Sequence, residues 1–127
     1  MKVYDFYGEY NCKSEDELLK ALKVRSKNSS NEFELRNDAE YPFMTILIKE
    51  DYACVHYFKD EQDVGRYAFS RDSVQIEDEY ITFNMGSEDM ETEVSNKMVI
   101  SVEKAYTVAK DFFNTSQMSS DVEWYQL

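Results

Sequence analysis

The chain has 127 residues, which is enough for one domain with one hydrophobic core. It carries 26 Asp and Glu residues against 14 Lys and Arg, a formal net charge of -12, so it would repel the phosphates of nucleic acids and anionic membrane surfaces. Because 43% of the residues are hydrophobic and 15% are aromatic, the composition is typical of a folded protein and not of a disordered one.

No segment approaches the roughly 18 apolar residues of a membrane span, and the N-terminus lacks the apolar stretch of a secretion signal. We therefore expect a protein that stays in the compartment where it is made. The two cysteines, Cys12 and Cys54, stand in no C-x-x-C pair. The sequence predicts two free, partly buried thiols, and it favours neither a disulfide scaffold nor a zinc site.

The N-terminal third predicts a strand followed by a helix. Residues 3–7 are rich in aromatic and β-branched side chains, and Gly8 closes the segment as a turn former. Ser14, with Glu17 three residues later, matches a capping box, and apolar residues follow at helical spacing. We expect this helix to bury one face and to end in the polar run 27–31.

The middle of the chain is typical of strands. Some segments alternate between apolar and polar residues, and others are dense in strand-forming side chains, with turn-forming residues such as Pro42 between them. These segments are 32–36, 43–48, 52–58 and 66–70. We expect them to form an antiparallel meander with 43–48 at its centre.

The last third predicts a hairpin and a second helix. Residues 81–85 alternate apolar and polar side chains, and the chain then turns back through 91–94, whose outward side chains are acidic. Ser101 is placed as the N-cap of a helix with one strongly apolar side. The only tryptophan, Trp124, is expected to pack against the core.

Together these elements predict an α+β fold, an antiparallel sheet of about five to seven strands with two helices packed on one face. No internal repeat, low-complexity tract or Pro- or Gly-rich linker marks a domain boundary. Residues 1–127 are therefore expected to form a single domain.

Candidate catalytic groups are few. The one histidine, His56, lies inside the strand 52–58 without a hydrolase or metalloprotease motif, so we expect its hydrogen bonds to be satisfied within the sheet. The carboxylates fall in turn-like runs, where water solvates them and no burial raises a pKa for acid catalysis. No run has calcium-loop spacing, and the three glycines lie too far apart for a phosphate cradle. The sequence predicts no catalytic residue, no metal and no cofactor, with a small carboxylate-dependent hydrolase as an alternative.

The acidic runs are interleaved with tyrosines. Solvated loops are the ordinary interpretation of a single run, but carboxylates also complement Lys and Arg and speed encounter, while tyrosines supply rigid contact area. We therefore predict a surface that binds a basic protein partner. Its candidate residues are Tyr57, Asp60, Glu61, Asp63, Tyr67, Glu77, Asp78, Glu79, Tyr80, Glu88 and Asp89.

Three consecutive segments near the C-terminus, 99–105, 109–115 and 122–124, together form one pattern. A short apolar and polar lead enters a helix with an inner alanine, an F-x-x-T stretch ends the helix, and V-x-W follows. This pattern resembles the closing segment of the Imm1 family of bacterial immunity proteins. Upstream, the helix start at 14–18 is similar to the early helix of that family, and the region of Tyr57 and 65–70 is similar to its central strands.

The resemblance implies a cytoplasmic protein encoded beside a polymorphic toxin of a contact-dependent or secretion-system type, which binds the C-terminal domain of the toxin and neutralises it stoichiometrically. Toxins paired with the family include nucleases and deaminases, whose substrate-binding surfaces are commonly basic. The expected partner is a cognate toxin domain with a basic surface, and neither a nucleic acid nor a membrane. The alternative is an acidic adaptor or chaperone-like module that binds another basic protein.

Overall fold

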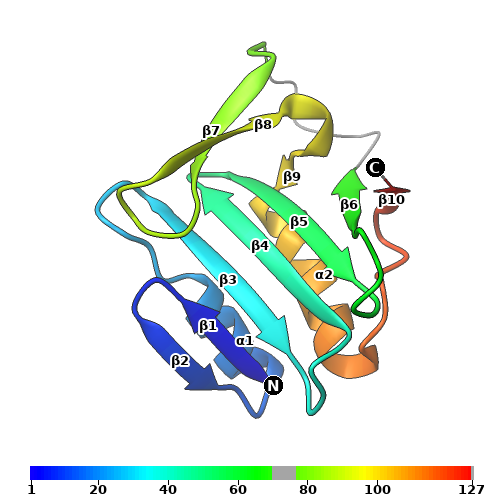
Figure 1. The fold of residues 1–127 in the computed structure, drawn as a ribbon. Helices are drawn as coiled ribbons and strands as arrows, with labels where there is room; N and C mark the ends of the chain where they lie inside the picture. Colours follow the sequence, from blue (N-terminus) through cyan, green and yellow to red (C-terminus); the bar gives the residue numbers. More distant parts are fainter. Residues whose placement is uncertain (70–76, 127) are drawn as a thin grey trace.

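The main sheet of the computed structural model is antiparallel, and the structure describes residues 1–69 and 77–126 (Figure 1). Seven strands lie on one path in the order β10-β6-β5-β4-β3-β1-β2, and the short β9 pairs with β5. The strands are β1 (Lys2–Asp5), β2 (Gly8–Asn11), β3 (Ser30–Arg36), β4 (Phe43–Lys49), β5 (Tyr52–Phe58), β6 (Arg66–Phe69), β9 (Ile100–Ser101) and β10 (Glu123–Gln126).

The predicted meander is confirmed. Strand β4 lies at the middle of the path and pairs along its whole length with β3 and β5. Its side chains separate into two sets, because Met44, Ile46 and Ile48 are fully buried on one face while Phe43 and Thr45 point to the other and stay half-buried. The fourth predicted strand is β6, and Ser70, the last residue of that prediction, lies outside the described residues.

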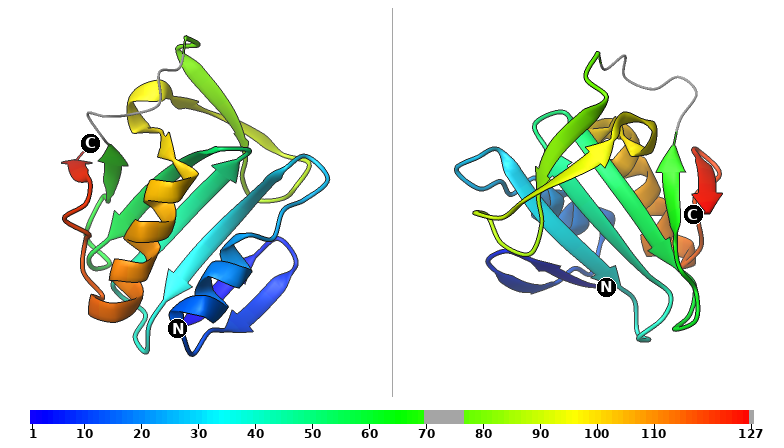
Figure 2. Two further views of the ribbon diagram at one scale, coloured as in Figure 1. Left: turned by 180° about the vertical axis from the view of Figure 1, so that it is seen from behind. Right: turned by 45° about the horizontal axis from the view of Figure 1, so that its top comes forward.

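Two helices, α1 (Glu15–Leu22) and α2 (Val102–Thr115), cover one face of the sheet, as Figure 2 shows from behind, so the predicted α+β class is confirmed. Both begin where their capping residues predict. The Ser14 hydroxyl accepts from the Glu17 amide and the Ser101 hydroxyl accepts from the Lys104 amide, each at 3.2 Å.

The first helix ends earlier than its sequence pattern predicts. It stops at Leu22, ahead of the polar run 27–31. The Arg25 guanidinium turns back to donate to the Leu22 carbonyl and to the Tyr106 hydroxyl of α2, the latter at 2.8 Å. The local bond to Leu22 satisfies a carbonyl at the helix end, and the bond to Tyr106 ties the segment after α1 to α2.

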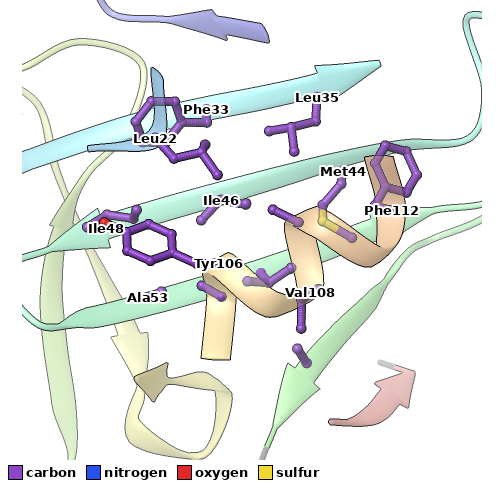
Figure 3. Packing of buried hydrophobic residues seen from close by; sticks show 14 of the residues in the cluster. Leu22, Phe33, Leu35, Met44, Ile46, Ile48, Ala53, Tyr106, Val108 and Phe112 are labelled. Carbon is purple, nitrogen blue, oxygen red and sulfur yellow. The ribbon is translucent and has the colours of Figure 1, made fainter. Parts of the chain in front are cut away.

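The larger core lies between the sheet and the helices (Figure 3). Phe33 from β3, Ile46 from β4 and Phe112 from α2 are fully buried there. Trp124 packs against the same cluster, as predicted, and its indole N–H donates to the Ser119 carbonyl at 2.9 Å. The strand that carries Trp124, β10, was not predicted, because its pairing with β6 is a long-range contact.

The N-terminal strand was predicted as one segment, and the structure contains a hairpin instead. The Asp5 carboxylate accepts from the Tyr7 amide at 2.8 Å and from the Gly8 amide at 3.1 Å, which turns the chain back after β1. Strand β2 then pairs with β1 at the edge of the sheet.

The predicted C-terminal hairpin is confirmed as β7 (Tyr80–Asn84) and β8 (Glu91–Ser95), which pair with each other in a separate two-stranded sheet. A 3-10 turn, η1 (Asn96–Met98), leads from β8 to β9. The hairpin crosses the sheet face that the helices leave uncovered (Figure 1). It is held there by a second buried cluster that includes Leu47, Cys54 and Phe83.

Candidate functional site

A groove of about 520 Å³ lies between the uncovered sheet face and the hairpin. Alternation along the strands forms its floor, because every second residue of β4 and β5 points away from the helices. The floor consists of Phe43, Thr45, Leu47, Cys54, His56, Phe58 and Tyr67. Residues 92–95 of β8 form the facing wall, with Glu32, Met85 and Met98 at the margins.

Aromatic rings form a continuous row across this floor. The His56 ring stacks on Tyr67 with centroids 4.0 Å apart and lies 4.1 Å from Phe58. Phe58 in turn stacks on Phe43 at 4.5 Å. Because these side chains are only half-buried, the part of each ring that its neighbours do not cover stays accessible to a partner.

The environment of His56 favours the neutral imidazole. Burial lowers the pKa of the imidazole, although a hydrogen bond with the Val64 backbone and the nearby Asp63 carboxylate act in the opposite direction. The Nε2 atom is buried and has no hydrogen-bond partner among the described residues. The expectation of a fully satisfied strand histidine is therefore wrong for this nitrogen.

Cys54 lies two residues before His56, on the same side of β5. Both cysteines are free, as predicted, and both are buried, where the sequence predicted partly buried thiols. Burial raises the pKa of the Cys54 thiol to about 12, so the thiolate that a nucleophilic cysteine requires is not formed at neutral pH. Cys54 therefore lacks the activated thiolate of a nucleophilic cysteine.

Across residues 1–69 and 77–126, no group of three His, Cys, Asp or Glu side chains is arranged to hold a metal ion. In the same part of the chain, neither helix has the length and apolar character needed to cross a membrane.

The predicted acidic residues lie in three separate regions of the molecule (Figure 1). Asp60, Glu61 and Asp63 belong to the loop between β5 and β6, and 77–79 precede β7. Glu88 and Asp89 belong to the hairpin turn between β7 and β8. The structure therefore does not gather the predicted set into one continuous surface.

The three predicted tyrosines differ in accessibility. Tyr57 is only 3% exposed and faces the helices, where its hydroxyl donates to the Ser116 carbonyl at 3.3 Å, so its assignment as a surface anchor is wrong. Alternation explains the error, because Tyr57 follows the outward-facing His56. Tyr67 lies in the groove, and Tyr80 is 54% exposed at the start of β7.

Several predicted carboxylates are already engaged within the chain. The Glu88 carboxylate accepts from the Tyr7 hydroxyl at 2.8 Å, and Asp89 forms an exposed ion pair with Lys27 at 3.5 Å. Asp60 is exposed but its carboxylate accepts from the Gln62 amide at 3.0 Å, and the other exposed acids of the predicted set are Glu61 and the run 77–79.

Asp63 organises the loop between β5 and β6. Its carboxylate accepts from the Lys59 amide at 2.9 Å, from the Gly65 amide at 3.0 Å and from the Arg66 guanidinium at 2.9 Å. The two backbone hydrogen bonds, with the Arg66 charge, hold the pKa of this carboxyl below its usual range. Because its side chain is only 7% exposed, Asp63 stabilises the loop and offers little charge to a partner.

Replacing Asp63 by asparagine is expected to lower the free energy of unfolding by about 1–3 kcal/mol at pH 7, since bonds to a charged acceptor are lost. The pKa of Asp63 is depressed in the folded state, so its contribution is present above 3.8, the usual value, and is lost as the pH falls through the folded-state value. The difference in melting temperature between wild type and D63N should therefore shrink as the pH falls below 3.8. The exposed Glu61→Gln serves as the control, and a difference that stays constant from pH 7 to well below 3.8 would contradict this assignment.

Sequence reasoning missed most of the groove. Phe43, Thr45 and Phe58 were assigned only to strands, and Glu93 only to the outward face of a hairpin. The sequence signal for Phe43, Thr45 and Phe58 was the alternation along 43–48 and 52–58, which places their side chains on the face of the sheet opposite to the helices. That signal identifies a face, but it does not show that a distant hairpin crosses it.

No family model matches the chain. Over 130 residues, covering 100% of both chains, it is 28% identical to a protein of Burkholderia cenocepacia (strain H111) named double-stranded DNA deaminase immunity protein. The resemblance to immunity proteins of toxin systems, first seen near the C-terminus, is confirmed by this full-length relative.

Proposed function

We propose that this chain is an immunity protein that binds a cognate toxin domain acting on DNA and inhibits it stoichiometrically. The observation that carries the proposal is the full-length similarity to an immunity protein whose name specifies a double-stranded DNA deaminase. A deaminase is therefore the favoured toxin activity, and a nuclease is the second.

The charge of the chain supports this partner. A domain that acts on DNA needs a basic surface to bind phosphates, and a chain with a net charge of -12 attracts such a surface over a long range. Attraction of this kind raises the rate of encounter and disfavours partners of like charge.

The chain is proposed to act by binding alone. The Cys54 thiol, with its pKa raised to about 12, and the neutral His56 beside it support an inhibitor without chemistry of its own. Because a toxin that acts on DNA must be met where the DNA is, we place the immunity protein in the cytoplasm.

The test uses the C-terminal domain of the toxin encoded beside this chain. Purified chain is titrated into that domain, base conversion in double-stranded DNA is read by sequencing, and strand cleavage is read on plasmid DNA. We expect the toxin activity to fall to background at one equivalent. Full activity in the presence of excess chain would contradict the proposal, and co-elution with full activity would favour the adaptor alternative.

The exposed run 77–79 is proposed to steer the toxin. Replacing its three carboxylates by lysine should lower the association rate about tenfold at low salt, since electrostatic steering depends on such charges. The melting temperature should change little, because the three side chains are exposed.

A matched control replaces Asp38, Glu40 and Glu50, also exposed, by lysine and changes the net charge by the same amount. If the two triple variants associate equally slowly, 77–79 contributes only through the net charge of the chain. If both associate at the wild-type rate, electrostatic steering does not contribute to binding.

A further inference from the structure

The groove on the uncovered sheet face combines ring faces with carboxylates. Phe58, Tyr67 and Phe43 contribute to its floor, and Glu32 and Glu93 are the acidic residues of its lining. None of the described residues that line it is Lys or Arg, and its one imidazole is held neutral by burial. The lining is therefore complementary to a cation that also presents a flat apolar surface.

From this complementarity we infer that the groove is the docking site for an arginine-bearing segment of the toxin domain. The inference rests on the proposed function and specifies which part of the partner is recognised. A guanidinium is planar, stacks on aromatic faces and pairs with carboxylates, whereas an ammonium offers only a compact point charge.

The chain already contains one contact of this kind at the end of the aromatic row. The Arg36 guanidinium lies over the Phe43 ring, 4.2 Å from its centroid, and pairs with the Glu34 carboxylate at 2.9 Å. Because Glu34 balances its charge, Arg36 does not make this end of the groove cationic. The internal contact covers Phe43, and the parts of Phe58 and Tyr67 that the neighbouring rings do not cover remain for the partner, since both side chains are only half-buried.

The two acidic residues of the groove differ in how they are held. One oxygen of Glu32 accepts from the Gly86 amide at 3.2 Å, which ties β3 to the hairpin turn and orients the carboxylate. Glu93 is exposed on β8 next to Val94, which packs against the sheet, so its carboxylate lies at the margin of the groove and can rearrange around a guanidinium without disturbing the fold. Substitution at Glu93 therefore separates partner binding from stability better than substitution at Glu32.

Two variants test the groove by independent means. Thr45→Trp places an indole on the floor, at the position that pairs with His56 of β5 and Glu34 of β3. Glu93→Lys reverses the charge on the wall. Each should weaken binding to the neighbouring-gene toxin domain at least tenfold, which corresponds to about 1.4 kcal/mol, and E93K should also reduce the dependence of affinity on salt.

Matched controls separate these effects from general ones. Asn11→Trp adds the same side chain at an exposed strand position on the far edge of the sheet, and Glu91→Lys makes the same charge change two residues away, outside the groove lining. Both controls should bind within twofold of wild type. Melting temperature is measured for each variant, and E93K carries the test if T45W does not fold.

The outcomes distinguish the two proposals. If the wild-type chain does not bind the toxin domain, the proposed function is overturned together with this inference. If the wild type binds and a folded T45W or E93K keeps its affinity, the inference is overturned while the proposed function remains. Loss of affinity in both groove variants, with both controls unaffected, supports an arginine-bearing segment in the groove.

Discussion

Replacing Gly65 by alanine is expected to lower the free energy of unfolding by about 2–4 kcal/mol, with a fall in melting temperature of roughly 10 °C. Gly65 has φ +95°, a conformation that strains any residue with a side chain. In addition, a Cβ atom at this position would lie 2.0 Å from Nε2 of His56 and within 3 Å of two further ring atoms.

The imidazole cannot easily move aside. His56 is stacked on Tyr67 and packed against Phe58, so displacement would break the aromatic row on the groove floor. We therefore expect G65A to weaken toxin binding as well as stability. Thermal melting and titration with the toxin domain measure the two effects separately.

Gly86→Ala is the matched control, because Gly86 also has a positive φ, +90°, but nothing lies within 4 Å of the Cβ position. G86A should lower the free energy of unfolding by only about 1 kcal/mol, because it adds backbone strain without a steric clash. A second comparison introduces G65A into His56→Ala, where the clash is removed and only the strain should remain. If G65A and G86A lower the free energy of unfolding equally, the clash with His56 does not contribute to the effect of G65A.

Replacing Phe83 by alanine is expected to lower the free energy of unfolding by about 3–5 kcal/mol, as is usual when a buried phenylalanine is truncated. Phe83 is fully buried and joins the hairpin to the main sheet through the cluster with Leu47, Cys54 and Val99. Strands β7 and β8 pair only with each other among the described strands, so side-chain packing holds the hairpin in place.

The loss should be concentrated in the hairpin. Hydrogen exchange measured by mass spectrometry should show reduced amide protection in β7 and β8, with β4 retaining more of its protection. Toxin affinity should fall too, because β8 forms the wall of the groove.

Phe112→Ala is the control for this experiment, because Phe112 is equally buried but belongs to α2 and packs in the larger core, away from the hairpin. It should destabilise the molecule by a similar amount without selective loss of protection in the hairpin. Equal loss of protection in all strands of F83A would contradict the view that the hairpin is a separately attached element.

Much of the architecture could be predicted because its causes are local. Ser14 and Ser101 are capping residues whose hydroxyls satisfy amides within the next turn, and both helices begin there. The central strand 43–48 is apolar enough to be buried, which places it in the middle of the sheet. The strand that was missed, β10, depends on a partner distant in the sequence.

The candidate site was harder to predict. The acidic runs were visible as composition, but Asp63 turned out to bind the amides of its own loop, and Tyr57 faces the helices. Assigning a face to each residue of β5 would have excluded Tyr57, since alternation places it opposite to His56.

By itself, the sequence determined the α+β class, the strand meander, the helix starts and the acidic character, because each depends on neighbouring residues or on simple sums over the chain. Only the tertiary structure decided that the hairpin crosses the free face of the sheet and that Phe58, Tyr67 and Glu93 border one groove. The physical reason is that buried clusters, such as the one that contains Phe83 and Leu47, join segments far apart in the chain. No local sequence pattern encodes which distant surface an apolar residue will cover.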